Sequence, residues 1–118
     1  MCLTWLNRSV PATAGARFAG PVAEHHDGFA MWDTKYSEWN AAKMGPKRDI
    51  VGELATAIKA RDMKFVTAFH HAANWFFFPV WDKRYDVADP RYSGLYGVIH
   101  EEGERPNKEF LDEWEGKI

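Results

Sequence analysis

The chain of 118 residues contains one cysteine, Cys2, which excludes a disulfide framework and a zinc site built from thiolates. Its 15 basic and 17 acidic side chains give a formal net charge of -2, and no segment gathers lysine and arginine into a patch. The sequence therefore predicts neither nucleic-acid binding nor attachment to a charged membrane surface.

Long apolar runs are also lacking. The longest of them fall far short of the roughly 20 residues that a helix needs to cross a bilayer. Residues 1–10 lack a charged start followed by an apolar stretch, so no signal peptide is visible and the localisation stays open. The length suits one small domain.

Aromatic residues, in contrast, are abundant. They make up 15% of the chain and include six tryptophans and eight phenylalanines. Many lie between residues 75 and 96, where Pro79, Pro90 and three aspartates favour loops over regular elements. Flat rings on a loop stack well on sugar rings, but the same residues also suit a hydrophobic core. The sequence leaves both interpretations open.

The pattern of apolar residues predicts a strand, a helix and a second strand. Residues 16–23 are mostly small and apolar, as in a buried strand, although Pro21 cannot donate a hydrogen bond to a neighbouring strand. An apolar stripe at helical spacing predicts a helix over 47–61. Residues 64–69 form the next predicted strand, and a right-handed crossover makes the two strands parallel.

The remainder is predicted to be a long loop followed by one helix. No periodicity is visible over residues 72–105. Pro106 suits the start of a last helix, with Phe110, Leu111 and Trp114 on one face. The predicted fold class is therefore α/β, with about two βα units and a long aromatic-rich loop.

Each predicted strand runs directly into a histidine pair, His25–His26 after the first and His70–His71 after the second. The carboxyl ends of parallel strands meet at one edge of a sheet, where active sites are commonly built. A neutral imidazole both donates and accepts a hydrogen bond, which suits sugar hydroxyls, and Asp27 can orient a neighbouring ring. The alternative is a half-buried pair that satisfies its own hydrogen bonds.

Two motifs carry a resemblance to a known family. The run HHDGF at 25–29, followed by Trp32, and the run GPKRDIVGEL at 45–54 resemble the α-L-fucosidases of glycoside hydrolase family 29. The resemblance is strongest over residues 16–75 and looser over 76–114. It implies a (β/α)₈ TIM-barrel-like fold, in which residues 1–118 form an internal fragment of the catalytic barrel domain.

The resemblance also implies the substrate and its contacts. The substrate is a fucosylated glycan, from which terminal α-L-fucose is hydrolysed with retention and without a cofactor. His25 and His26 are expected to contact the fucose hydroxyls. Trp32 and Trp75, with the aromatic loop, are expected to wall the pocket or to contact the rest of the glycan. The tyrosine pair of many members is replaced here by Ala68-Phe69.

No catalytic residue is assigned in this chain. The family uses an aspartate nucleophile and a separate acid/base carboxylate, which in retaining enzymes lie about 5–5.5 Å apart. The resemblance places the nucleophile on a strand beyond Ile118, so the chain alone is expected to be inactive. Turn, cap or surface roles are expected for four acidic residues: Glu24, Asp27, Asp33 and Asp49.

The sequence also allows three other interpretations. The two histidine pairs, with Asp27 or Asp33, could bind Zn²⁺, but their spacing matches no standard zinc pattern and no metal site is predicted. A partial barrel leaves open strand edges and apolar faces, so a non-catalytic remnant that binds sugar or self-associates is the second hypothesis. A truncated reading frame with no independent role is the third.

Overall fold

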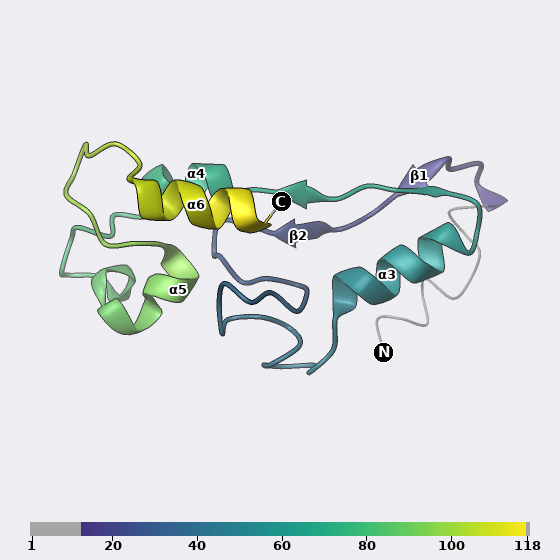
Figure 1. Ribbon diagram of the computed structural model, residues 1–118, viewed down its shortest axis with the longest axis horizontal. Coiled ribbons are helices and arrows are strands. Elements are labelled where there is room, and N and C mark those ends of the chain that lie inside the picture. Colours follow the sequence, from purple (N-terminus) through teal and green to yellow (C-terminus); the bar gives the residue numbers. More distant parts are fainter. Residues whose placement is uncertain (1–12, 118) are drawn as a thin grey trace.

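The computed structural model describes residues 13–117, so Cys2 lies outside the described part. The molecule is elongated, with extents of 49 × 25 × 23 Å (Figure 1). Its radius of gyration is 16.6 Å, against about 13 Å for a compact domain of this length. The elements are therefore spread out along one axis and do not close around a single centre.

Within residues 13–117, four short strands form two parallel pairs. β1 (Phe18–Ala19) pairs with β3 (Lys64–Phe65), and β2 (Val22–Glu24) pairs with β4 (Ala68–Phe69). The predicted parallel arrangement is confirmed, but each predicted strand is divided in two. The described strands close no barrel, and the fold is a mixed arrangement of helices and strands.

The division of the strands falls at Gly20, where the chain closely approaches Val66. A Cβ atom at this position would lie 1.5 Å from the carbonyl oxygen of Val66, so the two backbones approach where only glycine fits. Pro21 follows and has no N–H to donate, but its carbonyl accepts from the amide of Ala68 at 3.2 Å. The strands thus stay side by side across the break (Figure 1).

The helix predicted over 47–61 is observed as α3 (Ile50–Lys59). It begins later than predicted because Lys47 has a φ of 51°, which is outside the helical region. Asp49 is the N-cap residue, and its carboxylate accepts from the amide of Gly52 at 2.8 Å. Of the turn, cap and surface roles that the sequence left open for Asp49, the structure shows the cap. Ile58 is the residue of α3 that is fully buried.

The segment after β4 is not the unbroken loop that the sequence predicted. It contains the helix α4 (His71–Phe77), the 3₁₀ turns η1 (Asp86–Ala88) and η2 (Pro90–Tyr92), and the short helix α5 (Ser93–Tyr96). These elements were missed because each is short and because the buried face of α4 is partly polar. A hydrophobic stripe is therefore absent from the sequence of α4.

The predicted last helix is confirmed as α6 (Lys108–Lys117), which lies beside α4 (Figure 1). It begins after Asn107, whose side chain accepts from the amide of Phe110 at 2.9 Å. Of the predicted apolar face, Phe110 is buried but Leu111 is 39% exposed. Within residues 13–117, no helix has both the length and the apolar character that a membrane span requires.

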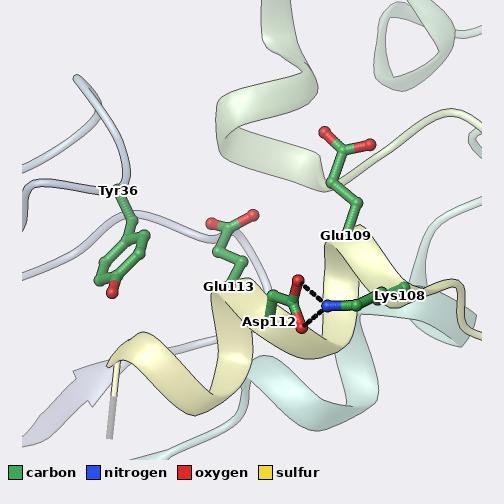
Figure 2. A pocket seen from close by; sticks show the side chains of 5 residues that line it. All are labelled: Tyr36, Lys108, Glu109, Asp112 and Glu113. Carbon is green, nitrogen blue, oxygen red and sulfur yellow. Dashed lines mark hydrogen bonds and ion pairs between the residues drawn. The ribbon is translucent and has the colours of Figure 1, made fainter.

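A hollow of about 610 Å³ lies along α6 (Figure 2). Tyr36 lines it from a loop, and the helix contributes one lysine and three acidic residues: Lys108, Glu109, Asp112 and Glu113. Lys108 Nζ is paired with the Asp112 carboxylate at 2.5 Å. None of the site residues predicted from the sequence lines this hollow.

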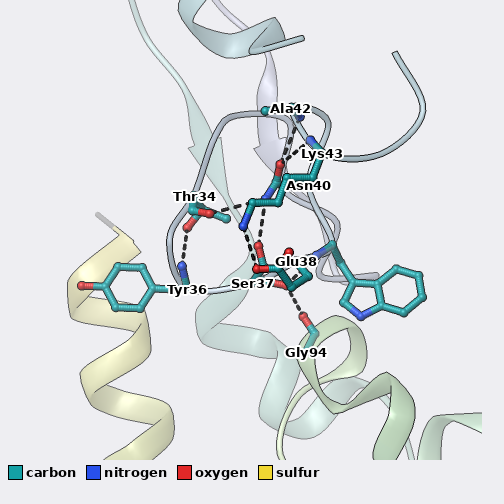
Figure 3. A network of polar contacts seen from close by, with 9 residues as sticks. Thr34, Tyr36, Ser37, Glu38, Asn40, Ala42, Lys43 and Gly94 are labelled. Carbon is teal, nitrogen blue, oxygen red and sulfur yellow. Dashed lines mark hydrogen bonds and ion pairs between the residues drawn. The ribbon is translucent and has the colours of Figure 1, made fainter. Parts of the chain in front are cut away.

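The segment between β2 and α3 is held in shape by the buried side chain of Asn40 (Figure 3). Its amide nitrogen donates to the carbonyl of Ser37 at 2.8 Å, and its oxygen accepts from the amide of Lys43 at 3.0 Å. The Ser37 hydroxyl donates to the Gly94 carbonyl at 2.8 Å. This network ties the segment to α5.

Candidate functional site

Three imidazoles meet at the carboxyl ends of β2 and β4. The rings of His25 and His70 stack with centroids 4.3 Å apart, and His26 stands edge-on to both. Nε2 of His26 lies 3.4 Å from Nδ1 of His70. The predicted meeting of the two strand ends is therefore observed, and we call His25, His26 and His70 the histidine cluster.

His26 is held from the direction of α4. Its Nδ1 lies 3.3 Å from Oδ1 of Asn74, and the ring of Phe77 stacks on it with centroids 4.0 Å apart. Asn74 is 2% exposed, so its amide belongs to the interior of the chain. The imidazole of His26 is thus held at its Nδ1 edge by Asn74, and one face of the ring is covered by Phe77.

His25 is exposed, and its ring is oriented by the backbone. Its Nδ1 accepts from the amide of His26 at 2.8 Å. The chain turns at Gly28, where φ is 72° and the amide donates to the His25 carbonyl at 3.0 Å. Asp27 accepts from the amide of Phe29 at 3.2 Å, which is the turn role expected for it.

Burial lowers the pKa of His70, and the nearby rings of His25 and His26 lower it further. Removal from water disfavours the imidazolium, and neighbouring positive charges would repel it. The lowered pKa favours the neutral form of His70, which offers one N–H donor and one acceptor nitrogen. That form suits hydrogen bonding to hydroxyl groups.

His71 does not join the cluster, although it adjoins His70. It begins α4, and its Nδ1 lies 2.5 Å from Oε1 of Glu24. Both side chains are buried, with 5% exposure for His71 and 0% for Glu24. The turn, cap or surface role expected of Glu24 is therefore wrong, because this carboxylate is an internal partner of a buried imidazole.

The two predicted tryptophans differ in their placement. Trp32 is half-buried and stands edge-on to Phe69, with ring centroids 5.5 Å apart. Trp75 is 2% exposed, stacks on His100 at 4.0 Å and donates from its indole nitrogen to the Glu104 carbonyl at 2.8 Å. Of the two interpretations left open for the aromatics, Trp75 therefore follows core packing, and its ring is not accessible to a ligand here.

The histidine cluster also contains the nitrogens that a metal ion would need. One ring nitrogen from each member lies within 4.8 Å of those of the other two, and the group includes neither Asp27 nor Asp33. A metal must lie near the plane of each ring, at about 2.0–2.1 Å from the nitrogen. The planes of His25 and His70 are 20° apart and stacked, so they do not converge on one point.

Parallel strands with polar side chains at their carboxyl edge are an arrangement in which α/β proteins bind ligands. The family model described as alpha-L-fucosidase matches residues 5–118. The chain therefore belongs to the α-L-fucosidase family.

Individual relatives agree with this assignment over about half of the chain. Human tissue α-L-fucosidase is 39% identical over 64 residues, and a Caenorhabditis elegans relative that carries the α-L-fucosidase name is 46% identical over 65. These matches cover 53% and 54% of this chain, but 14% and 13% of the relatives. The chain thus spans about one-seventh of the length of these relatives.

A solved structure shows the same similarity. The Thermotoga maritima α-fucosidase, determined in complex with fucose, aligns with a TM-score of 0.50 and 41% sequence identity. The alignment covers 56% of this chain and 15% of that enzyme. The mixed helix-and-strand arrangement is therefore similar to part of a fucosidase structure.

The sequence left two features of the site unassigned. His70 was visible only as half of a histidine pair, and the position of its ring depends on the register of β2 and β4. Nothing in the sequence indicated Asn74 as a site residue, because asparagine is common in segments predicted as loop. Its spacing of three residues from His71 would have indicated a shared helix face if α4 had been foreseen.

Proposed function

We propose that residues 1–118 form one segment of the catalytic (β/α)₈-like barrel domain of an α-L-fucosidase. The parent enzyme would hydrolyse terminal α-L-fucose from fucosylated glycans with retention. The observation that carries this proposal is the histidine cluster at the shared carboxyl edge of β2 and β4, in a chain of the α-L-fucosidase family.

In this proposal the cluster binds the sugar. His25 and His26 hold fucose hydroxyls by hydrogen bonds, and His70 adds a third imidazole beside them. The half-buried ring of Trp32 stays the proposed aromatic contact. Trp75 supports α4 by packing, since its burial leaves no face for the glycan.

The same cluster supplies no catalytic pair. Retaining hydrolysis needs two carboxyl groups on either side of the glycosidic bond. The three members of the histidine cluster are imidazoles and carry no carboxyl group. The neighbouring Glu24 is engaged with His71 in the interior. We therefore propose that this segment contributes sugar binding and that other parts of the barrel contribute the reacting groups.

Stereoselective binding tests the proposal. L-fucose and its mirror image D-fucose have identical polarity, so only a shaped site distinguishes them. Isothermal calorimetry on the 118-residue chain is expected to give heat with L-fucose and none with D-fucose. His26→Ala should abolish the heat, whereas the matched surface change Lys35→Ala should retain it. Equal responses to both sugars would overturn the proposal.

A second candidate function is assembly with another copy of the chain. Exposed apolar side chains lie on the strands and between them, including Phe18 at 66% exposure, Val22 and Val66. Such side chains beside open strand edges favour association. Sedimentation of the wild type and of Val66→Lys tests it: a dimer that the substitution dissociates supports assembly, and a wild-type monomer at every concentration contradicts it.

A further inference from the structure

We propose that Asn74 is a positioning residue that fixes the tautomer of His26, so that Nε2 of this ring accepts a hydrogen bond from a ligand hydroxyl. The identity of the ligand rests on the proposed function. The tautomer itself does not, because it follows from contacts within the chain.

The first step is the contact between the amide and the ring. Oδ1 of Asn74 lies 3.3 Å from Nδ1 of His26. An amide oxygen can only accept a hydrogen bond, so the proton of the neutral imidazole resides on Nδ1. Nε2 then carries the lone pair. Asn74 is 2% exposed, so little water can compete at its end of this contact.

The second step is the direction of the free lone pair. Nε2 of His26 lies 3.4 Å from Nδ1 of His70, so it faces the interior of the cluster. With no ligand bound, the N–H of His70 can donate to it. The N–H of His70 then donates to His26, and the N–H of His26 donates to the amide oxygen of Asn74. A sugar hydroxyl that displaces the His70 contact meets an acceptor already in place.

The third step is the rigidity of the ring. Phe77 follows Asn74 by three residues, which places both on one face of α4. Its ring stacks on His26 with an interplanar angle of 15°. One helix thus holds the edge of the imidazole through an amide and its face through an aromatic ring. Rotation of the imidazole by 180° would place the acceptor nitrogen elsewhere.

The fourth step is the anchorage of α4. Its first residue, His71, is hydrogen-bonded to Glu24 at 2.5 Å. Glu24 in turn directly precedes His25 in the sequence. Trp75 fixes the middle of the helix through the Glu104 carbonyl and the His100 ring. The helix is therefore tied to β2 and to the C-terminal segment, and it carries Asn74 at a set distance from the cluster.

Nitrogen-15 NMR of the imidazoles in the 118-residue chain tests the inference at pH 7.5. His26 is expected to show a protonated Nδ1 and an unprotonated Nε2. In Asn74→Leu the two tautomers should mix, and L-fucose should bind about tenfold more weakly, the loss that corresponds to about 1.4 kcal/mol. The exposed neighbour Phe76 provides the control: Phe76→Leu should leave the tautomer and the affinity unchanged.

A second variant keeps the test decisive if Asn74→Leu does not fold. Asn74→Asp has the same shape but adds a carboxylate, which favours the imidazolium of His26 and removes its acceptor nitrogen. Both ring nitrogens should then be protonated, and L-fucose affinity should fall. An unprotonated Nδ1 on His26 in the wild type would overturn the inference. So would a His26 tautomer that stays the same in the Asn74 variants. The expected tautomer without L-fucose binding would uphold it and contradict the proposed function.

Discussion

Oε1 of Glu24 lies 2.5 Å from Nδ1 of His71, and both side chains are buried. This bond joins the last residue of β2 to the first residue of α4. Each partner adjoins a member of the histidine cluster, since His25 follows Glu24 and His70 precedes His71. The shape of the cluster therefore depends on a polar contact behind it.

Removal of this contact should destabilise the fold. In His71→Leu the buried carboxylate of Glu24 loses this hydrogen bond, which typically costs about 1–3 kcal/mol. The urea midpoint is expected to decrease accordingly. The double variant Glu24→Leu/His71→Leu should recover part of the loss, because neither member of this buried pair then remains without the other. An unchanged midpoint in the single variant would show that the bond contributes nothing.

The lowered pKa of His70 predicts a pH dependence of stability. Folding holds this pKa below its ordinary value of 6.5, so the unfolded chain binds the proton more readily. Above pH 6.5 the titration of His70 does not reduce the free energy of unfolding. As the pH falls below that value, the unfolded chain takes up the proton first and the free energy of unfolding decreases. Urea midpoints from pH 8 to pH 5 should fall more steeply for the wild type than for His70→Gln. Parallel profiles would contradict this prediction.

Gly28 should tolerate no side chain. Its φ is 72°, and a Cβ atom there would lie 1.6 Å from the carbonyl oxygen of Leu95. Gly45 is a matched control, with a φ of 60° and no atom within 4 Å of an added Cβ. Gly45→Ala should cost only the backbone strain, of order 1 kcal/mol. Thermal unfolding should show a much larger loss for Gly28→Ala, and equal losses would contradict the close approach to Leu95.

The 118-residue chain should not turn over a fucoside. The histidine cluster can hold hydroxyls, but retaining hydrolysis also needs a nucleophile and an acid/base carboxyl group. Release of nitrophenol from 4-nitrophenyl α-L-fucoside is expected to stay at the uncatalysed rate, with the His26→Ala variant as the matched blank. Turnover that the wild type shows and the variant lacks would contradict the division of roles proposed here.

Much of the site could be predicted from the sequence because its motifs are local. The HHDGF run places His25 and His26 at the end of a strand, and Gly28 makes the turn that follows. The capping role of Asp49 is likewise set by nearby residues. These features depend on a few neighbouring positions, which a single sequence displays.

The remainder depends on contacts between distant positions. The break at Gly20 falls where the chain closely approaches Val66, and the burial of Glu24 arises from His71. The helix α4 was missed since its buried face includes His71 and Asn74, which no hydrophobic pattern reveals. Without the register of the strands, these pairs could not be matched.

The location of bound L-fucose tests the central claim most directly. Chemical-shift changes can be mapped over the 118-residue chain as the sugar is added. We expect the largest changes at the rings of His25, His26 and His70, and none at the hollow beside Tyr36 and α6. Changes confined to that hollow, or none at the three imidazoles, would contradict a fucose-binding histidine cluster.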